Sequence, residues 1–500
     1  MMGVETEYAL ARRGSARGSG WKIHTLEQIL RCAYSDLDCL RSDSGHGVFL
    51  SNGALLYADL GAHPELATAE CSDPLEATRQ VFAGDRLLHT LLERVIDDSA
   101  EAGDARLYKS NVDNRGATWG SHESYSVVVS PHDFSLPLAS FLATRIVFSG
   151  AGGLEQRGRT LRFALSPRAS FIEKTISSSS THARGILHDK HEPLACAPFH
   201  RLHLTCGDSL RSHYAMWLRL ATTGLVVAAL AAGARPSRHG LLVLPVRAMH
   251  VINNDERMRT RHTVASGARL SAIDIQRVYL EMVQVAGLHG LLPAWWPAAC
   301  REWARVLDAL ARNPAELAGR LDWPLRLGLF DAHLRAKGLS WRQLRLGPSG
   351  RYATPLLPWG EELEDPDVLN LIFGASAATR ARRARASSYE APLADELREI
   401  DLRFGELGPW SLHARLDAAG AITHRLFDDE ALERGTVEAP KRGRAKARGA
   451  AIRQLAGRRR SRLWASWEGV TDAERGVCLD LRHPMREQLE WKALGDDLPF

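Results

Sequence analysis

Four short segments of the chain alternate apolar and polar residues, and each places glutamate, aspartate or histidine on its polar side. They are Gly3 to Tyr8, Asn52 to Asp59, Gly120 to Tyr125 and Arg201 to Asp208. Residues that alternate with a period of two occupy the two faces of a β-strand. Four such strands in one sheet would form a face rich in carboxylates and imidazoles. The pattern therefore predicts a sheet with one ligand-binding face.

The first segment presents two carboxylates on one side of a strand. In the run GVETEY, strand alternation separates Glu5 and Glu7 from Val4, Thr6 and Tyr8. The two carboxylates are then about 7 Å apart. Such a pair suits Mg²⁺, which prefers oxygen ligands and commonly bridges to nucleotide phosphates. A solvated strand face is the alternative interpretation of these residues.

The second segment adds three carboxylates within a short stretch. The Asn-Gly pair at 52–53 predicts a hairpin turn, and the strand after it displays Tyr57 and Asp59 on one face. Glu65 and Glu70 follow on a loop or irregular strand. Such a density of negative charge is costly unless cations neutralise it. A polar surface hairpin is the alternative interpretation.

The other two segments each contribute a histidine. His122 stands at the start of a valine-rich strand, and His203 alternates with leucines. Both are candidate metal ligands, although a lone histidine is more often structural. The chain has no G-x-x-x-x-G-K-[ST] loop and no G-x-G-x-x-G that opens a helix after a strand. The sequence thus predicts a sheet-lined nucleotide site with several metals rather than a common nucleotide-binding fold.

The whole chain indicates one large catalytic domain with smaller additions, since 500 residues exceed what one hydrophobic core usually supports. Residues 1–345 mix strand-like runs with helical periodicity, which predicts an α+β domain. Residues 346–392 are a Pro-, Gly- and Arg-rich insertion, and 393–430 complete the catalytic domain. We expect 431–500 to form a small C-terminal domain that ends, at 479–496, in a strand and a short helix.

Three features of the sequence indicate where in the cell the protein is located. The N-terminal residues show no signal-peptide pattern. The most apolar stretch, Leu220 to Ala234, is about fifteen residues long, short of the roughly twenty that a membrane span needs, so we expect a buried helix. The 7 cysteines are scattered without a C-x-x-C pair, which argues against a disulfide framework or a structural zinc site. A cytoplasmic protein with no membrane partner is the expectation.

Positive charge is concentrated late in the chain. The net charge is only +5, but Lys441 to Arg462 contains ten Lys or Arg and no acid. This asymmetry indicates an acidic partner. A nucleic-acid-binding protein is a rival hypothesis, suggested by this stretch and by Arg380 to Arg385. The absence of aromatic residues within both clusters argues against a stacking platform for bases.

Several blocks resemble, in order and spacing, the family of Pup ligases (PafA) and Pup deamidases (Dop). They are GVETEYA, NGALLYADLGAHPELATAEC, YKSNVDNRGATWGSHESY and HRLHLTCGDS, followed by SAIDIQRVYLE, RLDWPLRLGLFD, EAPKRGRAKARGAAI and LRHPMREQLE. The resemblance implies a glutamine-synthetase-like α+β fold, in which a curved antiparallel sheet packed against helices cradles ATP and Mg²⁺. It also implies a small α/β domain at the C-terminus.

The resemblance also implies roles for individual residues. The implied metal ligands are Glu5, Glu7, Glu65, Glu70, His122 and His203. The implied cofactor-binding residues are Tyr57, Glu7, Arg201, Lys109 and Asn111. Asp59 falls on the catalytic aspartate of the family.

Two activities fit this resemblance, and we favour the ligase. There, ATP phosphorylates the C-terminal glutamate side chain of a small acidic Pup-like modifier, and a lysine of a substrate protein forms the isopeptide bond. Lysine has a reference pKa of about 10.4, so it is protonated near pH 7 and a base must take its proton before it can attack. Asp59 is the candidate base. In the deamidase, the nucleotide is a cofactor and Asp59 acts as nucleophile or activates water.

Sequence details point both ways between these activities. The short path from Ser42 to Leu50 into the NGALLY block resembles the ligases, whereas AECSDP and RLDWP resemble the deamidases. Asp189 to Leu194 departs from the family's T-R-D-E-P-H. That departure leaves the identity of the modifier open.

Overall fold

The computed structural model describes residues 1–12, 20–341 and 391–494, apart from 60, 62, 100–101, 114–115, 158–159, 180–181, 190–191, 193 and 459–461. The predicted insertion at 346–392 lies outside these residues except for its last two.

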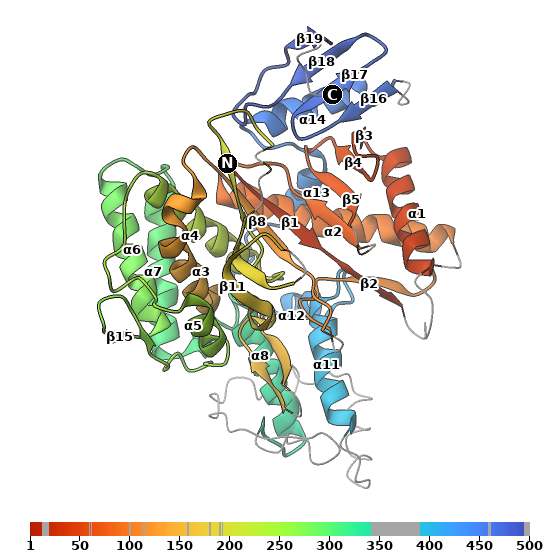
Figure 1. The fold of residues 1–500 in the computed structure, drawn as a ribbon. Helices are drawn as coiled ribbons and strands as arrows, with labels where there is room; N and C mark the ends of the chain where they lie inside the picture. The colour runs from red at the N-terminus through yellow and green to blue at the C-terminus, as the bar shows by residue number, and fades with distance from the viewer. Residues whose placement is uncertain are drawn as a thin grey trace.

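A 13-stranded sheet runs through the molecule in the order β11-β12-β13-β8-β1-β6-β5-β4-β3-β16-β17-β18-β19 (Figure 1). Neighbouring strands are antiparallel except in the parallel pairs β11–β12 and β3–β16. The strands are β1 (Met2–Glu7), β3 (Cys39–Ser42), β4 (Gly47–Leu50), β5 (Leu55–Ala58), β6 (Pro64–Ala67), β8 (Ser121–Val127), β11 (Ile172–Ser177), β12 (Arg184–His188), β13 (His200–Leu204), β16 (Leu463–Ala465), β17 (Gly469–Asp472), β18 (Val477–Asp480) and β19 (Trp491–Ala493). Three small pairs join β2 (Ala9–Arg12) to β7 (Ala105–Tyr108), β9 (Gly153–Arg157) to β10 (Thr160–Ala164), and β14 (His262–Thr263) to β15 (Arg269–Leu270).

Helices pack mainly against one side of this sheet, so the predicted α+β class with a mostly antiparallel sheet is confirmed. They are α1 (Gly20–Asp36), α2 (Pro74–Asp98), α3 (Ser135–Ser149), α4 (His213–Ala231), α5 (Pro245–Ile252), α6 (Ala272–Leu288), α7 (Trp296–Arg312), α8 (Asp322–Ala336), α11 (Ala391–Gly405), α12 (Leu412–Ala418), α13 (Asp429–Val437) and α14 (Arg444–Leu455). Short 3₁₀ turns are η1 (Pro131–Phe134), η2 (Pro167–Phe171) and η3 (Pro314–Leu317). Local chemistry sets the helix starts: Asp73 caps α2 by accepting from the N–H groups of Leu75 and Glu76, and an aspartate completes a capping box with Ser271 at α6.

Helix α4 contains the most apolar stretch of the chain. Among the described helices, it alone has the length and hydropathy to cross a membrane, and 78% of its apolar window is buried within the protein. The prediction of a buried helix is confirmed, but the helix is longer than expected because it begins at His213, capped by Ser212.

The two faces of the sheet differ in what covers them. Val4 and Thr6 of β1 are 2% and 1% exposed on the face toward the helices, which we call the back face. The front face carries Glu5 and Glu7, which are less buried. At β3 and β4 the front face is covered instead by α14, which packs on Leu40 and Phe49 (Figure 1).

The hairpin between β4 and β5 forms as predicted from the Asn-Gly pair. Gly53 has φ +86°, a left-handed conformation that glycine adopts without steric cost. The side-chain oxygen of Asn52 accepts a 3.0 Å hydrogen bond from the Ala54 N–H. This turn fixes the register that places Tyr57 on the front face.

The short helix expected near the C-terminus is absent from the described residues. After β18 the chain passes through a turn and returns as strand β19, which pairs with β18 at its outer edge. The prediction was wrong because pairing with an open strand edge decided the conformation of residues 491–493. The C-terminal strands also extend the main sheet through the β3–β16 pair.

Candidate active site

Neighbouring strands bring five of the predicted metal ligands onto the front face. Strand β1 lies between β8 and β6, and the registers pair Glu5 with His122 and Glu7 with Glu65. Residues opposite each other on antiparallel strands have Cβ atoms about 5 Å apart. His203 joins from β13, where it lies opposite Ser124. We call Glu5, Glu7, Glu65, His122 and His203 the ligand cluster.

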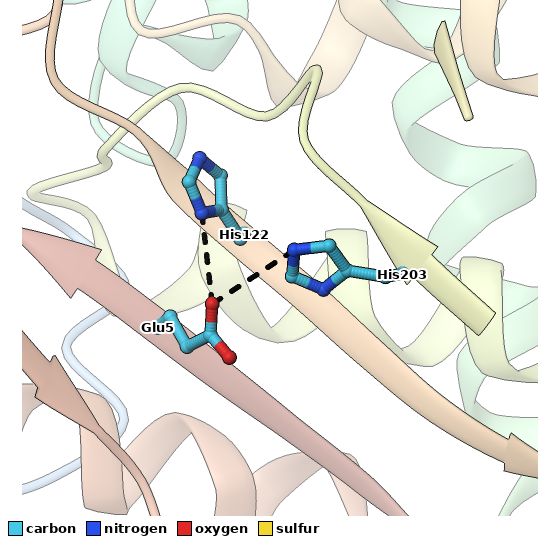
Figure 2. A group of neighbouring side chains, drawn as sticks. All are labelled: Glu5, His122 and His203. Atoms are coloured by element: carbon cyan, nitrogen blue, oxygen red, sulfur yellow. Dashed lines mark ion pairs between the residues drawn. The ribbon is translucent and has the colours of Figure 1, made fainter. Parts of the chain in front are cut away.

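The ligand cluster divides into two groups that share His122: Glu5, His122 and His203, and Glu7, Glu65 and His122. Within each group, one ligand atom per residue lies within 4.8 Å of the others. Figure 2 shows both imidazoles turned toward Glu5, with His122 Nδ1 3.6 Å and His203 Nε2 3.9 Å from Glu5 Oε2. His122 Nε2 lies 3.8 Å from Glu7 Oε1. These donors and spacings fit divalent cations that accept carboxylate and imidazole ligands.

Gly120, directly before β8, makes room for this arrangement. A Cβ atom at this position would collide with the imidazole of His122. The Gly120 N–H also donates a 2.7 Å hydrogen bond to Glu7 Oε2. One glycine therefore lets His122 pack beside Glu7 and orients the Glu7 carboxylate.

Glu65 lies beside other carboxylates, and no arginine or lysine among the described residues is hydrogen-bonded to it. Burial, reinforced by the charges of Glu5 and Glu7, raises the pKa of Glu65 to about 9. Tyr57, hydrogen-bonded to Glu65, has its pKa raised by burial and by Glu5, so it stays neutral. A cation among these carboxylates would reverse the effect on Glu65, because a nearby positive charge favours the ionised form.

Glu5, by contrast, has a positive partner within the chain. Arg201 Nη2 donates a 2.5 Å hydrogen bond to Glu5 Oε1. Burial acts to raise the pKa of Glu5, but His203, His122 and Arg201 together lower it well below its usual range. Glu5 is therefore ionised and already compensated.

Asp59, the predicted catalytic residue, lies at the rim of the ligand cluster, just after β5. Its carboxylate accepts a hydrogen bond from the Gly61 N–H and lies 3.9 Å from His63 Nδ1. Partial burial acts to raise the pKa of Asp59, but His63 and the Gly61 N–H lower it. An ionised carboxylate beside a metal-binding group can accept a proton or act as a nucleophile.

Glu70, also predicted as a metal ligand, belongs to neither group of the ligand cluster. Its Oε1 accepts a 2.6 Å hydrogen bond from Arg444 Nε, and Oε2 accepts a 2.9 Å hydrogen bond from Arg448 Nη1. Burial acts to raise the pKa of Glu70, but the two arginines lower it to about 2. These two residues of the basic stretch are buried, so they are not exposed to attract the acidic partner that the stretch indicated.

Two residues predicted to bind the cofactor are engaged elsewhere. Lys109 is buried and forms a 2.7 Å ion pair with Asp85. Asn111 is buried and bonds the backbone of Ser209 through both its amide oxygen and its nitrogen. Both side chains tie the segment after β7 to the backbone of residues 209–210, and neither lines the pocket beside the ligand cluster.

A pocket of about 500 Å³ opens beside Glu5, and we call it the front pocket. Its volume is in the range of ligand sites. The predicted residues that line it are Glu5, Tyr57, Glu70 and Arg201. A larger cavity of about 650 Å³, between the β9–β10 hairpin and α11, includes none of the predicted site residues.

The C-terminal segment supplies part of the front pocket that sequence reasoning missed. Arg444 and Trp467 line it together with Thr68 and Ser44. Arg444 also donates to the backbone oxygen of Leu194, and so holds the chain before β13 against α14. Arg444 lies in a block that resembles the family, but local patterns do not show that it and Trp467 line the pocket, because that role depends on contacts between distant parts of the chain.

Comparison with known proteins gives consistent matches. A family model described as Pup-ligase protein matches residues 1–348 and 379–471. A Pup deamidase/depupylase of Mycolicibacterium smegmatis is 36% identical over 305 residues, which are 60% of this chain and 60% of that protein. The match thus spans less than two thirds of that relative's length. A Pup–protein ligase of Bifidobacterium longum is 35% identical over 363 residues, 67% of this chain and 71% of that protein.

Two solved structures share the fold. One is the complex between the prokaryotic ubiquitin-like protein Pup and its ligase PafA, with a TM-score of 0.76 at 23% identity, covering 97% of this chain and 90% of that one. The other is the Pup ligase PafA in complex with ADP, with a TM-score of 0.70 at 22% identity, covering 92% and 90%. The glutamine-synthetase-like fold expected from the sequence is confirmed by this likeness.

Proposed function

The chain belongs to the Pup-ligase protein family, and from that premise we propose that it is an ATP-dependent ligase that joins a small Pup-like modifier to lysine side chains. One observation carries the proposal: two groups of carboxylate and imidazole ligands lie together on the front face, and Glu5 of the first group lines a pocket of about 500 Å³. An ATP-dependent ligase needs a place for a nucleotide next to a place for its cations. The ADP complex of a PafA ligase with the same fold supports the nucleotide assignment.

The ligand cluster would hold divalent cations, which we propose to be Mg²⁺. When bound, they would neutralise phosphate charge during phosphoryl transfer. Glu5 and His203 would hold one and Glu7 and Glu65 the other, with His122 between them. Arg201 and Arg444 line the front pocket and would bind anionic groups of the nucleotide.

The acceptor step follows from the chemistry of a carboxylate. Transfer of a phosphoryl group to the C-terminal glutamate side chain of the modifier replaces a poor leaving group with phosphate. The lysine amine then attacks the activated carbonyl, phosphate leaves, and an isopeptide bond forms. Asp59 would take the proton that the amine must lose, because its carboxylate is ionised at neutral pH.

A Pup-like deamidase is the second candidate, favoured by the 36% identity to a Pup deamidase/depupylase. The same site would then hold the nucleotide without consuming it. Asp59 would attack a side-chain amide or activate water against it, and the amide nitrogen would leave as ammonia.

One experiment separates the two activities. The purified protein is incubated with Mg²⁺, ATP, a lysine-bearing protein and a modifier ending in glutamate or, in a parallel reaction, in glutamine. The ligase predicts one ADP formed for each isopeptide bond with the glutamate form. Ammonia released from the glutamine form, with no matching ADP, would instead establish the deamidase.

Asp59→Asn is the matched control for both reactions. Loss of a general base or nucleophile should lower turnover about 10²–10⁴-fold, while nucleotide affinity changes little because Asp59 does not line the front pocket. Wild-type turnover in this variant would remove Asp59 from its assigned role. A short acidic open reading frame ending in Glu or Gln near the gene would identify the modifier.

A further inference from the structure

The two groups of the ligand cluster differ in how their charge is balanced. In the first group, Glu5 is the one carboxylate, and Arg201 is hydrogen-bonded to it. In the second, two carboxylates, Glu7 and Glu65, face each other across paired strands. The charge of Glu5 is therefore compensated within the chain without any added cation, whereas no arginine or lysine among the described residues is hydrogen-bonded to Glu7 or Glu65.

We infer that Arg201 is an internal counter-ion that occupies the place of one divalent cation, so that the second group binds a cation first and the first group only after Arg201 moves. The inference rests on the proposed function in treating the ligand cluster as a divalent-cation site. It does not depend on which reaction the protein catalyses.

The position of Arg201 supports this role. Its side chain is 11% exposed and is held on two sides, since Nε donates a 3.1 Å hydrogen bond to Ser124 and Nη2 donates to Glu5. A divalent cation beside the Glu5 carboxylate would lie within a few ångströms of the guanidinium charge. Like charges at such distances repel by several kcal/mol in a partly buried site, at an effective dielectric constant of about 20.

The contact between Arg201 and His203 is a second reason why Arg201 must move before the first group binds a cation. Arg201 Nη2 also lies 3.3 Å from His203 Nδ1. A guanidinium can only donate hydrogen bonds, so this contact is favourable when Nδ1 accepts and the ring proton is on Nε2. His203 Nε2 is the atom that faces Glu5, and a protonated nitrogen cannot bind a metal. Withdrawal of Arg201 would free both the carboxylate and the imidazole.

The structure also offers Arg201 other anionic partners. Its Nη1 lies 4.0 Å from Glu192 Oε2, whose side chain is 51% exposed. Both residues line the front pocket, where a nucleotide phosphate would compete for the guanidinium. Binding of a phosphate there would draw Arg201 from Glu5 and open the first group to its cation, which couples the second cation to the nucleotide.

The test counts bound Mn²⁺ by equilibrium dialysis and electron paramagnetic resonance, without nucleotide, modifier or target protein. The wild-type protein should bind one Mn²⁺ tightly and a second at least about tenfold more weakly. Arg201→Met should bring the second affinity up to that of the first. Arg201→Lys, which keeps the charge, should resemble the wild type. Arg305→Met, an exposed arginine on α7, controls for net charge and should change neither affinity.

A second pair of variants tests the order without altering Arg201. Glu5→Gln should keep the tight Mn²⁺ site, and Glu7→Gln should lose it. Two equally tight sites in the wild type, or a weak second site that persists in folded Arg201→Met, would overturn the inference. Because no turnover is measured, failure to detect ligation or deamidation would leave this result intact.

Discussion

The two faces of strand β8 differ in the partners that they give to charged and titratable residues. On the back face, Glu123 is completely buried and bonded through both carboxylate oxygens to Arg145, with Arg219 3.6 Å away. On the front face, the adjacent His122 lies between the carboxylates of Glu5 and Glu7.

The chain itself balances the charge behind the sheet. In front, no arginine or lysine among the described residues is hydrogen-bonded to Glu7 or Glu65, and burial beside Glu5 and Glu7 raises the pKa of Glu65 to about 9, so Glu65 holds a proton. A divalent cation there would displace that proton and supply the positive charge that the chain does not. The contrast separates the structural carboxylate on the back face of the sheet, Glu123, from the ligand carboxylates on its front face.

Breaking the Arg145–Glu123 ion pair on the back face should give the largest loss of stability. Arg145→Met leaves the buried Glu123 without its main partner and should lower the free energy of unfolding by about 3–5 kcal/mol. Denaturant unfolding with and without Mg²⁺ measures this, and the loss should be the same in both. The double variant with Glu123→Gln should recover part of the stability. Full restoration by Mg²⁺ would place Glu123 among the cation ligands.

Removing a front-face carboxylate should lower the affinity for Mg²⁺ and leave the stability of the metal-free protein intact. Burial beside Glu5 and Glu7 keeps Glu65 protonated in the metal-free protein, and Gln resembles that neutral side chain, so Glu65→Gln should be about as stable as the wild type without Mg²⁺. Its affinity for Mg²⁺ should fall about 10–100-fold, as measured by calorimetry. A clear loss of stability without Mg²⁺, with unchanged affinity for the ion, would contradict the contrast between the faces.

Cation affinity should depend on pH with a definite sign. The pKa of Glu65 is raised to about 9 in the folded, metal-free protein, against an ordinary value near 4.3. The folded state thus holds a proton that the unfolded state loses, so this group's contribution to stability declines as pH rises between these values. A cation must displace that proton, so Mg²⁺ affinity should increase with pH, by at most about tenfold per unit. Calorimetry at pH 6, 7 and 8 measures the trend, and a pH-independent affinity would show that Glu65 is not a ligand.

Glu70 should affect cation binding least. Arg444 and Arg448 already balance its charge, so Glu70→Gln should change Mg²⁺ affinity by less than about threefold. Proteolysis or hydrogen exchange should instead detect loosening of α14. A large loss of Mg²⁺ affinity would restore Glu70 to the ligand role that the sequence suggested.

The sequence predicted the parts of the site that local alternation determines. Glu5 and Glu7 share a face because strand periodicity is two, and the Asn-Gly turn fixes the strand that carries Tyr57. The pairing of Glu7 with Glu65 could be expected only from the family likeness, since register between strands has no local signal.

Glu70 and Lys109 have charge partners that the sequence did not predict, and in both cases the physical cause is contact between distant parts of the chain. Glu70 is hydrogen-bonded to Arg444 and Arg448, which are 374 and 378 positions away along the chain. The residues around Glu70 show no pattern that predicts these partners. Lys109 lies in a motif typical of the family, but its charge is balanced by Asp85 within the core. Burial decided its role, and burial is a property of the folded chain.

We propose that the ligand cluster, and not Glu70 or Glu123, holds divalent cations. Crystals grown with Mn²⁺ and a non-hydrolysable ATP analogue, measured for anomalous scattering, test it most directly. We expect anomalous peaks within about 2.5 Å of carboxylate oxygens of Glu7 and Glu65, and of Glu5. Peaks at Glu70 or Glu123, or no peak on the front face at saturating Mn²⁺, would contradict the account.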